Sequence, residues 1–326
     1  MTGYEHVEIG GIGFRYIKPY EYVYTTYCKE RWQNKPILDI FTKDFKAFDE
    51  QYYFNAIVNG SILVNGLTVE HNYIVKNGDC ITHKTIRREP LVLDIPIAIC
   101  ADLPNILVVN KPPSIPCHPT GMYNKNTLVS ILENDFGYKN LNLIHRLDRV
   151  TSGTVIMAKN AQMAKNLTNL LKTHTTEKWY VARVKGNFPY SETEVDAGIS
   201  CKSHKEGIYQ VDETGKASRT YFKKKGFDPA SNQTVVYCRP FTGRTHQIRV
   251  HLMHLGYPIA NDVCYGGEAI NQANAEWVQN DQLNDEFQGS KKNQKQLEIW
   301  LHAFRYKLTQ NLDFRVPLPL WAEIED

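Results

Sequence analysis

The sequence predicts an α+β protein with a mainly antiparallel, mixed main sheet, flanking helices and a small N-terminal domain. Three observations predict this fold class. The chain has 326 residues, more than one small module needs, because domains usually contain about 100 to 200 residues. Strand-length apolar runs dominate, and helical patterns are interspersed among them without strict strand–helix alternation. Asn-Gly dipeptides, which are typical of tight turns, separate short apolar runs near the N-terminus.

These patterns divide the chain into three blocks. Residues 1–40 are rich in aromatic side chains but lack a hydrophobic period, so we interpret them as an N-terminal extension that packs on another part of the chain. Residues 41–95 have a short helical start followed by the turn-separated apolar runs, which predicts a compact domain. Residues 96–326 form the large domain. Within it, residues 268–297 are rich in Gln, Asn, Asp and Lys, so we expect a flexible insertion there.

In the large domain, apolar runs predict six strands, and two stretches with helical spacing predict helices. One helix is expected at 161–174, where apolar residues recur on a single face. Another is expected to begin at Thr245, which can cap a helix, and to end at Gly256, which suits the position just past the last turn. The predicted strands are 105–110, 142–147, 154–159, 179–184, 218–223 and 234–238.

Composition and charge restrict the class of protein. Hydrophobic residues make up 42% of the chain and charged residues 22%, which is ordinary for a soluble globular protein. The formal net charge of +3 neither predicts nor excludes a nucleic-acid partner. Seven cysteines without a C-x-x-C pair argue against a disulfide scaffold and a cysteine-based zinc site. With no signal-peptide pattern and no apolar run of about 18 residues, we expect an intracellular protein, with the cytoplasm favoured and the nucleus and mitochondrion open.

The most informative segment is HRLDRVTSG at 145–153, which two apolar runs enclose. Asp148 therefore lies on a connection between predicted strands, where a rigid scaffold can present a functional group. Because Arg146 and Arg149 stand on either side, we expect its carboxylate to be ionised at neutral pH. Such an aspartate can be a nucleophile, a base or half of a structural ion pair, and the residues alone leave all three open.

A second segment, RPFTGRTHQIRVHLMH at 239–254, places a Gly-Arg-Thr turn at the start of a predicted helix. Arg244 and Arg249 flank the first turn, where backbone N–H groups and guanidinium groups together suit an anion. His251 and His254 share a helix face, which permits a metal site. No H-E-x-x-H motif accompanies them, so structural histidines are the favoured interpretation.

Tyr180 lies in a third segment, KWYVARVKG at 178–186, where a buried core tyrosine is the simplest interpretation. Taken together with WLHAF at 300–304, however, the three segments resemble those of the RluA-type pseudouridine synthases in their order, their spacing and their amino-acid residues. The resemblance covers about residues 105–310 and is nearly word for word in the aspartate and GRTHQIR motifs. It implies the pseudouridine synthase fold and an RNA-modifying isomerase that needs no cofactor and no metal.

The same resemblance implies a role for individual residues. Asp148 matches the family's nucleophile, and Arg249 matches the residue that pairs with it. Tyr180 matches the tyrosine that stacks under the base and is suited to moving a proton at C5. Arg146 matches the residue inserted into the stack after the base is flipped out, and Leu301 matches the apolar residue of the uracil pocket. Whether the aspartate attacks C1′ or C6, or assists formation of a glycal, stays open.

Residues 41–95, with AIVNGSILVNGLTV as their turn pattern, are similar to the S4-like RNA-binding module. The opening block, with YIKPYEYVYTTYCKERW, resembles the eukaryotic branch of the family that modifies transfer RNA. This implies an RNA partner, with transfer RNA favoured and position 32 of the anticodon loop as the expected target, no DNA and no membrane partner, and a monomer. The H-x-E and P-C-x-x-C signature of deaminases is missing, so we expect no deamination.

Basic side chains are candidates for contacts with the RNA backbone, which position RNA without reading its sequence. The predicted contact residues are Lys84, Arg87, Arg88 and Arg244, with the lysine run 223–225 as a weaker candidate. Two other functions are considered. One is a catalytically silent RNA-binding protein with a synthase fold, against which the presence of Asp148, Tyr180 and Arg249 argues. The other is a metal-dependent hydrolase that uses His251 and His254.

Overall fold

The computed structural model shows two compact units, each described here by itself. One comprises residues 18–88, and the other comprises the chain before and after it. The predicted boundaries at residues 40 and 95 therefore differ from the structural ones, because strands of the opening block pair with partners in both units. The predicted insertion at 268–297 lies almost entirely outside the described residues. The structure describes residues 4–45, 47–172, 176–204, 206–269 and 296–324.

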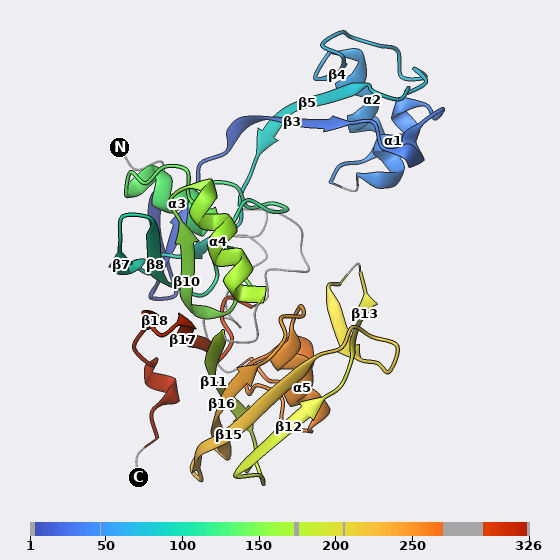
Figure 1. The fold of residues 1–326 in the computed structure, drawn as a ribbon. Helices are drawn as coiled ribbons and strands as arrows, with labels where there is room; N and C mark the ends of the chain where they lie inside the picture. The colour runs from blue at the N-terminus through green and yellow to red at the C-terminus, as the bar shows by residue number, and fades with distance from the viewer. Residues whose placement is uncertain (1–3, 46, 173–175, 205, 270–295, 325–326) are drawn as a thin grey trace. The chain divides into compact units, whose positions relative to one another are not determined.

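The small unit is an antiparallel sheet with two helices (Figure 1, blue to cyan). The strand order is β3-β5-β4, so the aromatic block contributes an edge strand rather than a separate extension. The core is formed by apolar side chains of the helices and the inner strands, such as Ile37, Ile57 and Ile81. The elements are β3 (Tyr20–Tyr27), η1 (Glu30–Trp32), α1 (Ile37–Asp44), α2 (Glu50–Val58), β4 (Ile62–Val64) and β5 (Cys80–Arg87).

Local chemistry sets the turns of this unit. Asp49 caps α2, because its carboxylate accepts the N–H of Tyr52 at 2.8 Å. The dipeptide Asn65-Gly66 has φ values of 52° and 78° and joins Val64 to Leu67 in a two-residue hairpin turn. Both residues tolerate positive φ, which is why the Asn-Gly pattern predicts this turn.

The large unit is organised around a ten-stranded sheet in the order β12-β15-β16-β11-β17-β10-β8-β7, with β18 on β17 and β9 on β10. Among the described strands, the pairing is antiparallel except between β10 and β17. This confirms the predicted α+β class with a mainly antiparallel, mixed sheet. The strands are β7 (Ala98–Asp102), β8 (Ile106–Lys111), β9 (Asn142–Leu143), β10 (Ser152–Ala158), β11 (Glu177–Lys185), β12 (Glu192–Asp196), β15 (Arg219–Asp228), β16 (Gln233–Pro240), β17 (Leu301–Thr309) and β18 (Leu312–Arg315).

Two smaller sheets complete the unit. Strands β1 and β2 pair with each other and β2 pairs with β6, which ties the start of the chain to the large unit. Strands β13 and β14 form a separate hairpin. No helix among the described residues is long and apolar enough to cross a membrane. The remaining elements are β1 (Glu5–Ile9), β2 (Ile12–Tyr16), β6 (Val92–Leu93), α3 (Leu128–Asp135), α4 (Ala161–Lys172), β13 (Ile199–Ser203), β14 (Ile208–Val211), α5 (Gln247–His254), η2 (Val263–Tyr265) and η3 (Leu320–Ala322).

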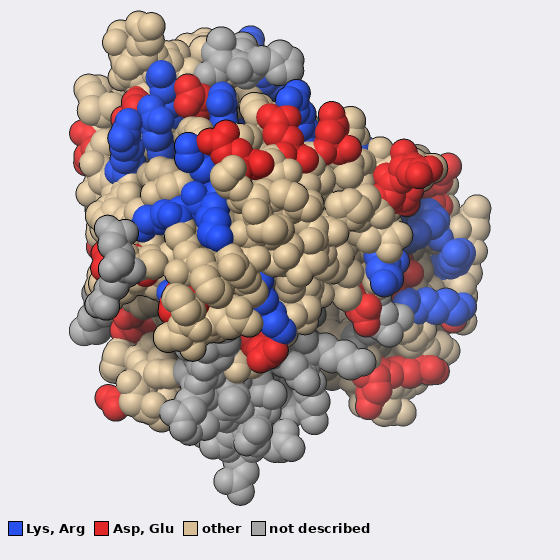
Figure 2. All heavy atoms as spheres, turned by 90° about the horizontal axis from the view of Figure 1, so that it is seen from below, with Lys and Arg blue, Asp and Glu red and all other residues tan. Residues whose placement is uncertain are grey.

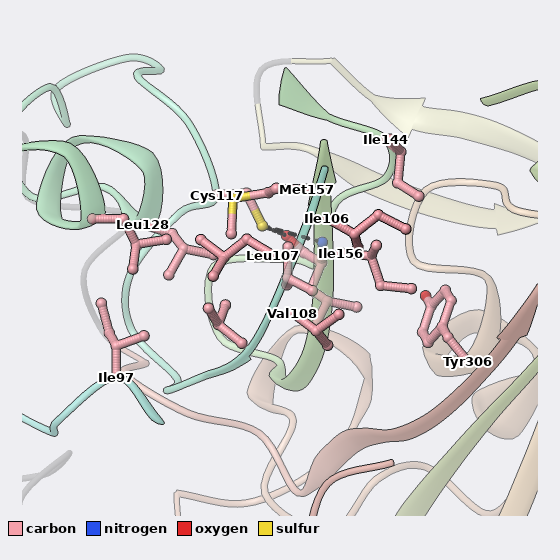
Figure 3. Packing of buried hydrophobic residues seen from close by; sticks show 14 of the residues in the cluster. Ile97, Ile106, Leu107, Val108, Cys117, Leu128, Ile144, Ile156, Met157 and Tyr306 are labelled. Atoms are coloured by element: carbon pink, nitrogen blue, oxygen red, sulfur yellow. Dashed lines mark hydrogen bonds between the residues drawn. The ribbon is translucent and has the colours of Figure 1, made fainter. Parts of the chain in front are cut away.

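Helices cover the two halves of the large sheet with separate cores. In one half, α3 and α4 pack on β8 and β10 through Leu128 and Leu167. Figure 3 shows this cluster, with Met157 of β10 near its centre and Tyr306 of β17 at one side. In the other half, α5 packs on β15 and β16 through Leu252. The parallel β10–β17 pair joins the two halves, so residues that begin these strands lie where both cores meet.

For two of the predicted elements, the difference from the observed ends has a clear physical cause. The strand predicted at 142–147 stops at Leu143, because the side chain of His145 takes the place of backbone pairing: its Nε2 accepts the N–H of Ile156 at 3.1 Å. The helix predicted from Thr245 begins at Gln247, because His246 has a φ of 57°, which a right-handed helix cannot include. It ends as predicted, with Gly256 at a φ of 83°.

Gly153, at the β10–β17 join, offers a test of this architecture. Its φ is 119°, and a Cβ added there would lie 2.5 Å from the backbone nitrogen of Ala303. We expect Gly153→Ala to lower the free energy of unfolding by about 2 to 5 kcal/mol, since both backbone strain and overpacking oppose it. The matched control is Gly137→Ala, where φ is 77° but no atom lies within 4 Å. Urea denaturation of both variants decides, and equal losses would contradict the close strand contact.

Candidate active site

The loop that carries Asp148 runs from β9 into β10 and is fixed from behind by a buried lysine. Lys111, at the end of β8, is fully buried. Its ammonium group donates to the carbonyl of Arg149 at 3.2 Å and to two further carbonyls in the segment that follows β8. Burial lowers the pKa of Lys111 to about 8. The lysine therefore holds the backbone directly after Asp148 in place.

A buried cysteine fixes the same loop on the other side of the aspartate. The Sγ of Cys117 accepts the N–H of Leu147 at 3.3 Å and lies 3.5 Å from the carbonyl oxygen of Leu147. Burial raises the pKa of the Cys117 thiol, so it is protonated at neutral pH. Figure 3 shows Cys117 within the apolar cluster. The sequence assigns no role to this residue, and the structure gives it a place in the support of the loop.

The loop borders a pocket of about 380 Å³ in the large unit. The pocket lies at the join of the sheet halves, since its lining comes from β11, β17, the loop before β10 and the start of α5. It contains six residues that the sequence predicts for the site, so residues up to 155 positions apart come together there. These residues are Arg146, Asp148, Tyr180, Arg244, Arg249 and Leu301.

Asp148 is held as a carboxylate in this pocket. Burial by itself would raise its pKa, but the charges of His246, Arg249 and Lys111 and a hydrogen bond from Arg249 outweigh burial, and the pKa is lowered. Burial lowers the pKa of His246, so its ring contributes a positive charge only in the acid range where Asp148 itself titrates. At neutral pH the ring is neutral, and the permanent positive charge beside Asp148 is Arg249. The Nη1 of Arg249 donates to Oδ2 of Asp148 at 3.2 Å. Asp148 is therefore ionised at neutral pH.

Arg249 is itself locked by a second aspartate. Asp262 is fully buried, and its two oxygens accept from Nε and Nη2 of Arg249 at 2.6 and 2.9 Å. Burial would lower the pKa of the guanidinium, but the charge and hydrogen bonds of Asp262 raise it. A two-point pair of this kind fixes the plane of the guanidinium. Asp262, which sequence reasoning missed, thereby aims Nη1 at Asp148. The only sequence signal for it is a carboxylate thirteen positions after Arg249, just past the predicted end of the helix.

A pair of tyrosines forms another wall of the pocket. The hydroxyls of Tyr180 on β11 and Tyr306 on β17 lie 2.5 Å apart. The ring of His145 stacks on Tyr306 with centroids 4.3 Å apart. Burial raises the pKa of Tyr180, although the hydrogen bond to Tyr306 lowers it in part, so Tyr180 is a neutral phenol at neutral pH. Tyr180 is thus not a plain core residue, because its hydroxyl has a polar partner and its ring borders the pocket.

The remaining predicted residues of the pocket differ in exposure. Arg146 and Arg244 are exposed, whereas Leu301 is buried and packs in the second core. A further basic group, missed from the sequence, lines the same pocket. Lys178 donates to the carbonyl of Thr242 at 3.2 Å, and burial lowers its pKa. The rim of the pocket therefore combines exposed arginines with an apolar floor.

The residues predicted to contact RNA outside the pocket differ in exposure. Lys84 is exposed and pairs with Glu21 at 3.0 Å, and Arg88 is exposed. Arg87 is buried, in contrast to these two residues. Its guanidinium lies over the ring of Tyr22, 4.5 Å from the ring centroid. Its position on β5 shares the inward face with Ile81, which the alternation along the strand explains. Arg87 is therefore not presented to a phosphate in this structure.

The lysine run at 223–225 is engaged within the protein. Lys223 pairs with Glu192 at 2.8 Å, Lys224 donates to Asn187 at 2.7 Å, and Lys225 donates to the carbonyl of Ala322 at 2.7 Å. Figure 2 shows one face of the molecule, on which basic and acidic side chains are interspersed rather than gathered in one patch. This agrees with the small formal net charge of +3.

The histidines of the metal hypothesis do not form a ligand set in the part of the chain that the structure describes. His251 is buried and shares hydrogen bonds with Thr220 at 2.9 Å and with the carbonyl of Ala197 at 3.1 Å. His254 is exposed. Within the described ranges, no three His, Cys, Asp or Glu side chains come close enough together to hold a metal ion. His251 is a structural histidine of the α5–β15 packing.

Comparison with known proteins defines the class. The sequence model of the RNA pseudouridylate synthase family matches residues 105–254. The mitochondrial tRNA pseudouridine(32) synthase of Saccharomyces cerevisiae is 40% identical over 260 residues, which cover 78% of this chain and 56% of that protein. The tRNA pseudouridine(31) synthase of the same yeast is 29% identical, and the match covers 96% of each protein. The chain belongs to the RNA pseudouridylate synthase family, as its motifs predict.

A solved structure shows the same fold. Human RNA pseudouridylate synthase domain containing 1 superposes with a TM-score of 0.51 at 24% identity, over 69% of this chain and 83% of that one. The likeness confirms the predicted pseudouridine synthase fold of the large unit. The chain spans little more than half the length of the first yeast relative.

Proposed function

We propose that this protein is an RNA pseudouridine synthase that isomerises a uridine of transfer RNA, with Asp148 as its nucleophile. The observation that carries the proposal is the carboxylate of Asp148, ionised and held by Arg249 at 3.2 Å in a pocket that Tyr180 and Leu301 also line. An anionic oxygen beside an apolar floor and a phenol suits a reaction on a flat, uncharged base.

The reaction requires no outside reagent. The N1–C1′ bond of uridine breaks, the uracil turns, and a C5–C1′ bond forms, while C5 loses a proton and N1 gains one. Asp148 provides the charged oxygen for the first step, either by attack at C1′ or C6 or by assisting loss of uracil as a glycal forms. Because uridine and pseudouridine are isomers, and the proton lost from C5 is balanced by the proton that N1 gains, no oxidant, reductant or energy source is needed.

Tyr180 is proposed to take part in the proton movement at C5. Its raised pKa keeps it a phenol, so it can accept the C5 proton only as it passes its own proton on. The hydroxyl of Tyr306, 2.5 Å away, is placed to share that proton. Leu301 supplies the apolar surface for the face of the uracil ring.

Arg146 is proposed to fill the gap that the flipped base leaves in the RNA stack, because it is exposed at the rim of the pocket that holds Asp148. We expect Arg146→Ala to lower turnover of folded transfer RNA roughly 10- to 100-fold. A loss of this size corresponds to part of the few kcal/mol that unstacking the base costs. Turnover of an unstructured oligonucleotide should fall much less in this variant, since its base is already accessible. Arg315→Ala, at an exposed arginine of β18 outside the pocket, is the control. Equal losses on both substrates would contradict the stacking role.

Contacts with the RNA backbone are proposed for three exposed basic residues: Arg244 at the rim of the pocket, and Lys84 and Arg88 outside it. The small unit is proposed to act as an S4-like RNA-binding module.

The cytoplasm remains the proposed compartment, and the mitochondrion is the alternative, since the name of one yeast relative includes the word mitochondrial. Fluorescent tagging at the C-terminus distinguishes the two. A monomer is proposed, and sedimentation of the purified chain tests it.

The target uridine is proposed to be position 32 of the anticodon loop, supported by the name of the 40%-identical yeast relative. The name of the second yeast relative makes position 31 the competing site. The test incubates the purified chain with transfer RNA transcripts that carry uridine at position 32 only, at 31 only, or at neither, and maps pseudouridine by reverse transcription after chemical tagging. Modification at 32 alone supports the proposal, and modification at 31 alone overturns the site assignment. Tight binding without modification of any RNA favours the silent RNA-binding protein.

A further inference from the structure

We propose that His246 is a positioning residue for Asp148, and that Tyr265 fixes the ring tautomer that His246 needs for this role. This inference rests on the proposed function of Asp148 as nucleophile. Asp148 then has two holders: Arg249, which supplies charge, and His246, which supplies a directed N–H group.

The two holders converge on one oxygen of the aspartate. The Nη1 of Arg249 lies 3.2 Å from Oδ2 of Asp148, and the Nε2 of His246 lies 3.7 Å from the same Oδ2. The second distance exceeds that of a hydrogen bond, so the proposed N–H contact requires the ring and the carboxylate to come closer together than they are in this structure. With both neighbours on Oδ2, the other carboxylate oxygen is the one presented to the substrate. The arrangement thereby selects Oδ1 as the reacting atom.

The hydrogen-bond chain behind His246 determines which ring nitrogen carries the proton. The hydroxyl oxygen of Tyr265 accepts the backbone N–H of Tyr209, on β14, at 3.0 Å. The same hydroxyl lies 2.7 Å from Nδ1 of His246. Tyr265 is buried, so the hydroxyl hydrogen needs an acceptor within the protein, and Nδ1 is the acceptor beside it. A ring whose Nδ1 accepts carries its proton on Nε2, the nitrogen that faces Asp148.

The backbone at His246 supports a functional reason for this residue. Its φ of 57° lies in the left-handed region, which residues other than glycine occupy rarely. It stands at the start of α5 yet makes no side-chain capping bond, so helix capping does not explain its conformation. In this left-handed conformation, the ring lies between Asp148 and Tyr265. The start of the helix does not itself require such a conformation. Burial also lowers the pKa of His246, in agreement with a neutral ring of fixed tautomer.

The test measures the tautomer first, by ¹⁵N NMR of the histidine-labelled full chain. His246→Gln identifies the resonances of His246 by their loss. We expect the wild-type ring to be protonated at Nε2 and the Tyr265→Phe variant, which lacks the donor to Nδ1, to show a mixture of both tautomers. A wild-type ring protonated at Nδ1 would overturn the inference without reference to activity.

Turnover then separates a positioning role from a merely structural one. We expect Tyr265→Phe to lower kcat about tenfold and to leave the Kd for transfer RNA unchanged. We expect His246→Leu to lower kcat about 100-fold, which is within the range of losses seen when an active-site hydrogen-bond donor is removed. His246→Gln keeps an N–H group and should recover at least part of that loss. His254→Gln, at the exposed histidine of the same helix, is the control. Equal losses in the glutamine and leucine variants overturn the inference, as does full activity of His246→Leu.

Failure of this inference is distinguishable from failure of the proposed function. If the wild-type chain forms no pseudouridine in any RNA, the proposed function is wrong and the positioning role of His246 falls with it. If the wild-type chain is active and the His246 and Tyr265 variants are equally active, the inference alone is wrong. Should His246→Leu not fold, Tyr265→Phe, which removes a single oxygen atom, still decides between these outcomes.

Discussion

Asp148→Asn is expected to abolish pseudouridine formation, with a fall in kcat of at least about 10⁴-fold, because loss of a nucleophile removes the step that all later steps depend on. The asparagine side chain has nearly the same shape and can still accept from Arg249, so the pocket should stay intact. The affinity for transfer RNA should stay within a few-fold, since the contacts proposed to dominate binding lie on exposed basic residues.

The control for this variant is Asp102→Asn. Asp102 is a half-exposed aspartate of β7 that pairs with Lys159, away from the pocket. Single-turnover kinetics and a binding isotherm on the same RNA measure both properties. An Asp148→Asn protein that still forms pseudouridine would show that another group is the nucleophile.

Arg249→Met is expected to have the second large effect, on stability and on activity together. It leaves the fully buried carboxylate of Asp262 without its partner, and breaking a buried ion pair on one side costs about 3 to 5 kcal/mol of unfolding free energy. It also removes the permanent charge beside Asp148, for which we expect a loss of kcat of roughly 10²- to 10³-fold.

A second substitution separates the two effects. Asp262→Asn in the Arg249→Met background removes the unpaired charge, and its amide oxygen can still accept the N–H of Cys264, which Asp262 accepts at 3.2 Å. The double variant should recover much of the stability and none of the activity. Thermal unfolding and single-turnover kinetics measure the two quantities. Recovery of activity along with stability would mean that Arg249 serves the fold alone.

The pH dependence of the Arg249→Met variants gives an independent readout. In the wild type, the lowered pKa of Asp148 keeps the carboxylate ionised down to a pH below the usual carboxyl range, so activity is lost only in that acid region. Without Arg249, burial acts with less opposition and raises the pKa. The acid limb of kcat/KM should therefore move to higher pH.

The sequence predicts the residues that line the site better than it predicts the buried residues that hold them in place. The two apolar runs around HRLDRVTSG place Asp148 on a connection between strands, and the strands on both sides are observed. Its role as nucleophile follows only from the resemblance of this segment to the family motif. Lys111 and Cys117 hold that loop, yet each looks unremarkable in the sequence, since a lysine at the end of an apolar strand is usually solvated. Asp262 and Tyr265 act through contacts with residues of α5, and such contacts depend on how η2 packs, which no local pattern encodes.

The errors also have physical causes. The boundary predicted at residue 40 differs from the limits of the compact units. The reason is that β2 pairs with β6 and β3 pairs with β5, over separations that no local pattern reveals. The charge of Arg87 predicts a surface contact with RNA, but the alternation along β5 places its side chain on the same buried face as Ile81 and His83. Thr245 fits the composition of a helix cap, but the left-handed turn at His246 delays the helix.

Release of tritium from C5 tests the central claim most directly, because isomerisation replaces the C5–H bond of the target uridine with a C5–C1′ bond. The purified wild-type chain and the Asp148→Asn variant are incubated with transfer RNA labelled with tritium at C5 of uridine. The account predicts release approaching one equivalent per RNA with the wild type and none with the variant. No release by the wild type from any transfer RNA that it binds, or equal release by both proteins, would contradict it.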